Sequence, residues 1–91
     1  MSNVLSESAR ELLREASQDP NGTIFRVPAM GGEYLKTNRR MFGGPPRERE
    51  RWLDAIRQLL RLELIEPHGD HGFSITTKGY RAAAALRNPG S

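Results

Sequence analysis

The chain of 91 residues contains no cysteine and only two histidines. The absence of cysteine excludes a disulfide framework, a thiolate metal site and a cysteine nucleophile. No apolar run approaches the roughly 20 residues of a membrane-spanning helix, and the first residues lack the basic start and apolar stretch of a signal peptide. We therefore expect a cytoplasmic protein with no membrane segment.

Aromatic residues make up only 7% of the chain and hydrophobic residues 36%, which suffices for one small domain with a modest core. No linker is long enough to divide the chain. We expect one domain over residues 1–87 and a disordered tail over residues 88–91. The large apolar residues expected in the core are Trp52, Tyr80, Phe73, Ile24 and Phe25.

The formal net charge is +3, and the positive charge is concentrated in the middle of the chain. Residues 1–20 hold four acidic and two basic side chains, whereas residues 21–65 hold nine basic and five acidic ones. A basic middle can be the electrostatic footprint of a nucleic-acid-binding protein. It can equally be an arginine-rich solvated face, because acidic residues stand close to most of these arginines.

Hydrophobic periodicity predicts three helices. The first begins after Ser6, a good N-cap, and the turn at residues 19–22 ends it. The longest helix covers residues 45–62, opens on two prolines, and has a wide apolar stripe opposite a face of arginines and acids. The last helix has Thr76 as its N-cap and runs to about Leu86.

Two pairs of strands separate these helices. Residues 23–27 and 33–37 are rich in β-branched and aromatic residues and predict a β-hairpin. Residues 64–67 and 73–75 predict a second hairpin around a polar turn. Residues 38–44 are predicted to be irregular, with at most one helical turn, because two glycines lie there.

Two stretches resemble a known family. Residues 62–83, with the pattern L-x-L-I-E-P-x-G-x-x-x-F-x-I-T-x-x-G-Y-x-x-A, resemble the end of many bacterial winged helix-turn-helix domains, and Thr76, Gly79 and Tyr80 match the start of their last helix. Residues 23–42 resemble a β-hairpin segment in a small winged module appended to assorted bacterial proteins. The resemblance implies an α+β winged helix with the order helix, β-hairpin, helix, two-stranded wing, helix.

The resemblance also implies a regulatory, non-catalytic domain that binds double-stranded DNA. In a DNA-reading winged helix, exposed residues of the long helix enter the major groove, and basic side chains contact phosphates. In that family a short helix precedes the recognition helix. In this chain the expected β-hairpin occupies that part of the sequence. The residues expected to contact nucleic acid, mainly at phosphates, are Lys36, Arg39, Arg40, Arg47, Arg49, Arg51 and Arg57.

A protein partner is the alternative. Acidic residues alternate with the arginines of the long helix and would repel a duplex. The wing tip, around His68 and His71, has no lysine or arginine to neutralise phosphates. On this interpretation an apolar patch with Met30, Met41 and Phe42 docks a protein partner or a second copy of the chain.

Catalytic, cofactor and metal sites have little support in the sequence. No nucleophile motif is present, and the two glycine pairs match neither a phosphate-binding loop nor a dinucleotide fingerprint. The trio His68, Asp70 and His71 lacks the further ligands that a metal site needs. We therefore expect no enzyme activity, no cofactor, no bound metal and no small-molecule substrate.

Overall fold

The structure is a computed structural model that describes residues 5–29, 32–38, 40–43 and 46–87. The α+β class is confirmed for these residues, and the tail expected over residues 88–91 lies outside them. The described elements, in chain order, are α1 (Glu7–Gln18), β1 (Thr23–Ala29), β2 (Gly32–Thr37), β3 (Arg40–Gly43), α2 (Pro46–Arg61), β4 (Ile65–His68), β5 (Gly72–Ile75) and α3 (Thr77–Arg87).

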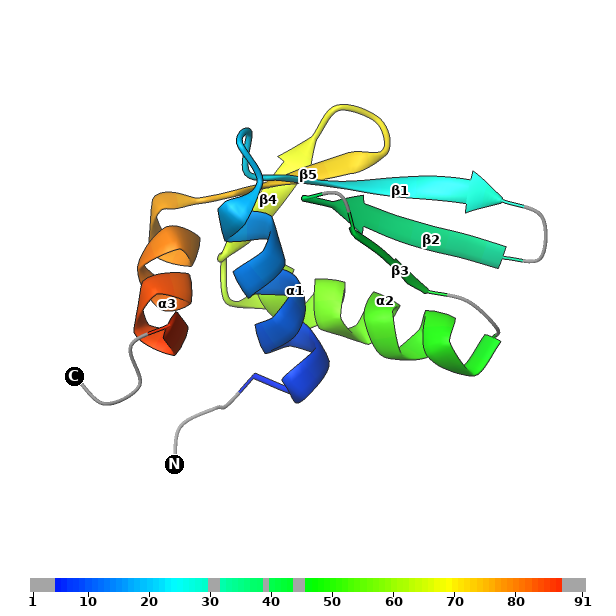
Figure 1. The fold of residues 1–91 in the computed structure, drawn as a ribbon, viewed down its shortest axis with the longest axis horizontal. Coiled ribbons are helices and arrows are strands. Elements are labelled where there is room, and N and C mark those ends of the chain that lie inside the picture. Colours follow the sequence, from blue (N-terminus) through cyan, green and yellow to red (C-terminus); the bar gives the residue numbers. More distant parts are fainter. Residues whose placement is uncertain (1–4, 30–31, 39, 44–45, 88–91) are drawn as a thin grey trace.

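The strands form one antiparallel sheet with the order β3-β2-β1-β5-β4. Strand β1 is central, because it pairs with β2 on one side and with β5 on the other. The two expected hairpins are therefore both present, and they share one sheet. Figure 1 shows α2 running below the strands, with α3 at the left-hand end of the molecule.

The two faces of the sheet differ. The inner face carries Ile24, Leu35 and Phe42, which are buried with residues of the helices in one core cluster. The outer face carries the residues that alternate with them, such as Phe25 and Met41, which are 46% and 53% exposed. The expectation that Phe25 belongs to the core is therefore wrong, because its neighbour Ile24 takes the inward position.

Strand β3 corrects the prediction of an irregular segment over residues 38–44. Arg40–Gly43 pair with β2, so that Phe42 lies beside Leu35. Asn38 turns the chain with a φ of 49°, a left-handed conformation that asparagine adopts more readily than most residues. Phe42 is only 4% exposed, and its ring centroid lies 4.7 Å from that of Trp52 on α2. Phe42 is thus a core residue and not part of an exposed patch.

The caps of α1 and α3 follow the sequence predictions. The Ser6 hydroxyl accepts a hydrogen bond from the N–H of Ala9 at 3.1 Å, and the Thr76 hydroxyl accepts one from the N–H of Gly79 at 3.0 Å. The expectation that Tyr80 belongs to the core is wrong: its side chain is 44% exposed, and its hydroxyl end lies against the buried Gly22.

Candidate functional site

The arginines on the exposed face of α2 are accompanied by carboxylates. Arg51 donates to Glu48 and Arg57 donates to Asp54, each at 3.4 Å and each one helical turn apart. Arg51 also donates to the hydroxyl of Ser8 on α1 at 2.6 Å. These contacts offset the positive charge of α2 and attach Arg51 to a neighbouring helix.

Arg40 has a structural role between β3 and α1. Its guanidinium donates to Glu15 at 2.9 Å and to Glu11 at 3.1 Å, and it lies over the ring of Phe42 at 4.7 Å. The hydrogen bond to Glu15, assisted by Glu11, raises the pKa of Arg40 above its ordinary value. A phosphate would have to compete with two carboxylates for this side chain.

Among the described residues of the expected nucleic-acid set, Lys36 does not share a surface with the arginines of α2. Lys36 is exposed on the outer face of β2, on the opposite side of the sheet from α2. Arg49 is half-buried, and its Nε has no hydrogen-bond partner among the described residues. Arg39 and the side chain of Arg47 lie outside the described part of the chain, as does Met30.

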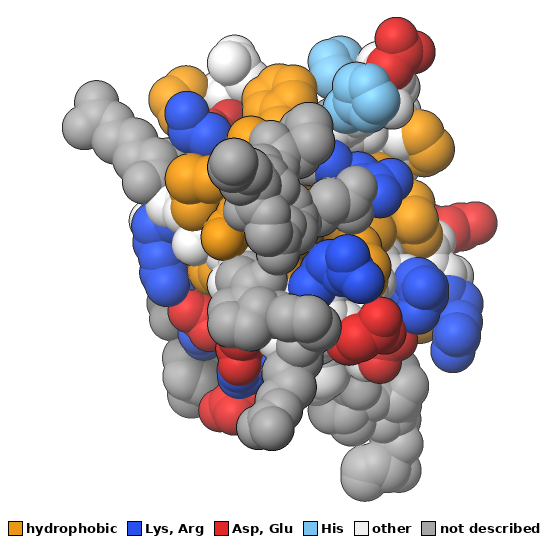
Figure 2. Space-filling view, turned by 90° about the vertical axis from the view of Figure 1, so that its right-hand side faces the viewer, with side chains coloured by type: hydrophobic (Ala, Val, Ile, Leu, Met, Phe, Trp, Pro, Cys, Tyr) orange, Lys and Arg blue, Asp and Glu red, His pale blue; other side chains and the backbone are white. Residues whose placement is uncertain are grey.

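The tip between β4 and β5 is polar and exposed. His68, Asp70 and His71 all face solvent, and Figure 2 shows the histidine side chains beside an acidic one at the upper right. Within the described ranges, no group of three or more His, Cys, Asp or Glu side chains could hold a metal ion.

A groove of about 250 Å³ lies between α2 and the inner face of the sheet. Leu53 and Leu60 contribute from α2, and Phe73 contributes from β5; all three are half-buried. Arg26 of β1 and Arg57 of α2 also line it. The full lining is Arg26, Leu35, Leu53, Ile56, Arg57, Leu60 and Phe73.

The groove is smaller than the roughly 300–1,000 Å³ of typical small-molecule sites, so it suits one or two side chains of a partner. Sequence reasoning missed it, because the apolar stripe of α2 was assigned wholly to the core. The i, i+7 spacing of Leu53 and Leu60, with Arg57 one turn from Leu53, was the available signal.

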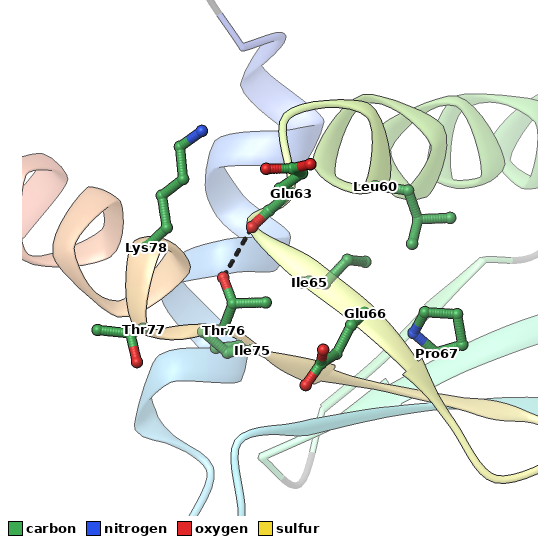
Figure 3. A pocket seen from close by; sticks show the side chains of 9 residues that line it. All are labelled: Leu60, Glu63, Ile65, Glu66, Pro67, Ile75, Thr76, Thr77 and Lys78. Carbon is green, nitrogen blue, oxygen red and sulfur yellow. Dashed lines mark hydrogen bonds between the residues drawn. The ribbon is translucent and has the colours of Figure 1, made fainter.

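A larger, more open hollow of about 750 Å³ lies where α2, β4 and α3 meet (Figure 3). The Thr76 hydroxyl lines it, but this hydroxyl donates to the carbonyl oxygen of Glu63 at 2.8 Å and accepts from Gly79. Figure 3 shows the side chains of Lys78 and Glu66 pointing in different directions. The hydrogen bonds of Thr76 therefore connect structural elements. The charged side chains around the hollow do not converge on one point.

The outer face of the sheet carries a continuous row of residues, one from each strand. In register from β3 to β4, this outer row consists of Met41, Lys36, Phe25, Gly72 and His68. A Cβ atom at Gly72 would lie 3.2 Å from Cδ1 of Phe25, so the Phe25 ring lies against Gly72. The row thus presents two large apolar side chains on either side of Lys36.

The described residues therefore offer two surfaces, the groove beside α2 and the outer row. None of the described helices is long and apolar enough to cross a membrane. Comparisons of the chain with protein-family models, with curated proteins and with solved structures found no match.

Proposed function

We propose that this chain is a non-catalytic protein-interaction module with a winged-helix arrangement, and that its groove beside α2 receives an apolar side chain of a partner. The observation that carries this proposal is the apolar lining of the groove. Leu53, Leu60 and Phe73 are only half-buried there, and burying such surface is the main driving force of protein association.

The charges around the groove indicate the chemistry of the partner. Arg26 and Arg57 line it together with the apolar residues, and Asp54 pairs with Arg57. Arg57 favours a partner segment in which a large apolar residue stands next to Asp or Glu. Arg57 can exchange its exposed partner Asp54 for such a carboxylate at little cost, because exposed ion pairs contribute only about 0–1 kcal/mol.

The winged-helix part of the proposal is supported by the order of elements. Apart from β2 and β3, the chain order is α1, β1, the long helix α2 and the two-stranded hairpin of β4 and β5. Strand β1 pairs with β5, the second strand of that hairpin. The extra strands β2 and β3 stand between β1 and α2, where the family has a short helix.

Selection from a displayed peptide library against the intact chain tests the function. We expect enriched peptides to contain Leu, Ile or Phe within two residues of Asp or Glu. Leu53→Gln should weaken their binding at least tenfold, and Arg57→Glu about fivefold. Arg61→Glu is the matched control, because Arg61 is an exposed arginine one turn further along α2 that does not line the groove. Peptides that bind the Leu53→Gln variant as tightly as the original chain would contradict the proposal.

Binding of duplex DNA is the second candidate, favoured by the net charge of +3 and the nine basic side chains in residues 21–65. The test is a titration with a 20-base-pair duplex at low and at physiological salt. Lys36→Ala and Arg39→Ala should each flatten the salt dependence, since each removes one phosphate contact. Arg40 is left unchanged, because its replacement would release Glu11 and Glu15. A duplex that shows no binding at low ionic strength would exclude this candidate.

A further inference from the structure

The turn between α1 and β1 contains two neighbouring residues that can react with each other, Asn21 and Gly22. Asparagine loses ammonia when the backbone nitrogen of the next residue attacks its side-chain amide. The reaction is fastest before glycine, because no side chain hinders the approach of that nitrogen. The other asparagines of the chain precede Val4, Arg39 and Pro89, and proline has no N–H to react. Asn21 is therefore the asparagine of this sequence that is most prone to deamidation.

In the closed turn, hydrogen bonds hold the backbone of both residues. The N–H of Gly22 donates to the carbonyl oxygen of Asp19 at 3.0 Å, and the N–H of Asn21 donates to Oδ2 of Asp19 at 2.9 Å. The carbonyl oxygen of Gly22 accepts from the N–H of Ile75 on β5 at 2.9 Å. Asn21 is exposed, whereas Gly22 is buried with the hydroxyl end of Tyr80 against it. The nitrogen that must attack is thus hydrogen-bonded and buried, while Asn21 is accessible to water.

We infer that Asn21–Gly22 is a site of spontaneous deamidation, and that the closed turn protects it until the connection between α1 and β1 opens. In the open turn the Gly22 nitrogen forms a bond to Cγ of Asn21, and the bond from Cγ to Nδ2 breaks. The amide leaves as ammonia with the proton of the Gly22 N–H, and a succinimide ring remains. Water then opens the ring at either carbonyl, which gives aspartate or isoaspartate at position 21. Water is the only co-reactant.

The product weakens the turn that protected it. Aspartate at position 21 adds a negative charge close to the carboxylate of Asp19, and a like charge opposes the ionised form of that carboxylate. Isoaspartate inserts an extra carbon into the backbone before Gly22, so the hydrogen bond from Gly22 to Asp19 loses its geometry. Because Asp19 also accepts hydrogen bonds from Thr23 and Asn38, deamidation loosens the attachment of α1 to the sheet.

Peptide mapping by mass spectrometry tests the inference on the intact chain, incubated at mildly alkaline pH with and without denaturing urea. We expect Asn21 to deamidate in urea as fast as an unstructured Asn–Gly peptide, and at least about tenfold more slowly in the folded chain. Asn38, which precedes Arg39, is the internal control and should react much more slowly in urea. An Asn21 that stays intact in urea would overturn the site, and equal rates with and without urea would overturn the protection.

Two variants at opposite ends of α1 distinguish opening of the turn from a general loss of stability. Asp19→Asn should speed deamidation of Asn21 in the folded chain about tenfold, the factor that corresponds to about 1.4 kcal/mol. The new side chain precedes Pro20 and does not react itself. Ser6→Ala removes the N-cap at the other end of the helix and should change the rate less than about twofold.

Circular dichroism of both variants would show that they remain folded. An unchanged rate in Asp19→Asn, or an equal acceleration by Ser6→Ala, would overturn the role of the turn.

Discussion

The Oδ1 atom of Asp19 accepts a hydrogen bond from the backbone N–H of Asn38 at 3.2 Å, across 19 residues of sequence. The other oxygen, Oδ2, accepts from the N–H of Asn21 at 2.9 Å and from the N–H and hydroxyl of Thr23 at 3.2 and 3.3 Å. Through these hydrogen bonds, one carboxylate connects the end of α1 both to the start of β1 and to the turn between β2 and β3.

Asp19→Asn should destabilise the fold by about 1–3 kcal/mol at pH 7, because it replaces a hydrogen-bonded acceptor by an amide that faces N–H donors. Burial raises the pKa of the Asp19 carboxyl, but the hydrogen bonds from Thr23, Asn21 and Asn38 outweigh burial and lower it below its ordinary value. The folded state therefore binds this proton less readily than the unfolded state does.

The stabilisation by Asp19 should be complete above the unfolded pKa of about 3.9 and should be lost as the pH falls through the lower folded value. Urea unfolding between pH 7 and pH 2 measures this effect. The Asp19→Asn variant should lose less stability on acidification than the original chain. Asp70→Asn, at the exposed tip, should behave like the original chain. Equal acid sensitivity of the original and Asp19→Asn chains would contradict the assignment.

Gly79→Ala should destabilise the protein by about 3 kcal/mol, because a Cβ atom there would collide with the carbonyl oxygen of Leu64 and lie 2.7 Å from Cγ2 of Ile75. Gly69→Ala is the comparison: it meets no atom within 4 Å, and only its φ of 71° opposes a side chain. That cost is about 1 kcal/mol. Thermal unfolding of both variants measures the difference, and similar melting temperatures would refute the close approach.

Phe42→Ala should lower the free energy of unfolding by about 3–5 kcal/mol, because it leaves a cavity beside Trp52 in the core. The neighbouring Met41→Ala should cost less than about 1 kcal/mol, since Met41 is largely exposed on the outer face. Chemical unfolding followed by Trp52 fluorescence checks both values. Comparable losses in the two variants would mean that the inward and outward positions of β3 are assigned wrongly.

Arg40 and Glu15 should show a coupling free energy of about 0.5–1 kcal/mol in a double-mutant cycle with alanine, because their side chains are partly exposed. The coupling should decrease between 50 mM and 1 M salt as the charges are screened. The same cycle on Arg57 and Asp54, which are more exposed, should give a smaller value. A zero coupling for Arg40 and Glu15 at low salt would show that this contact does not support the fold.

Local chemistry was sufficient to predict most elements. Ser6 and Thr76 cap their helices as expected, since an N-cap needs only a hydroxyl a few residues from the N–H that it satisfies. Strand β3 was missed because its evidence is not local. Its pairing with β2 and the burial of Phe42 against Trp52 outweigh the glycines that suggested irregular structure. Asn38, a turn-forming residue, was the signal that could have indicated a hairpin.

The candidate surfaces were harder to predict, because each combines residues that are distant in sequence. Arg26 and Arg57 meet at the groove only after β1 and α2 pack together. The sequence suggested that Arg40 is a free cation, but Glu11 and Glu15 of α1 form ion pairs with it across the gap between α1 and β3. Charge counting along the chain cannot distinguish a cation that faces solvent from one that a remote carboxylate has paired.

The central position of β1 also interlocks the two halves of the chain. Residues 7–43 contribute α1 and three strands, and residues 46–87 contribute α2, α3 and two strands, yet the sheet joins them only through the β1–β5 ladder. In the core, Phe42 of the first half packs against Trp52 of the second half. Arg51 of the second half donates a hydrogen bond to the Ser8 hydroxyl of the first half. Neither half can bury its apolar face alone. Two fragments cut between β3 and α2 should therefore be unfolded separately and should assemble the fold when mixed.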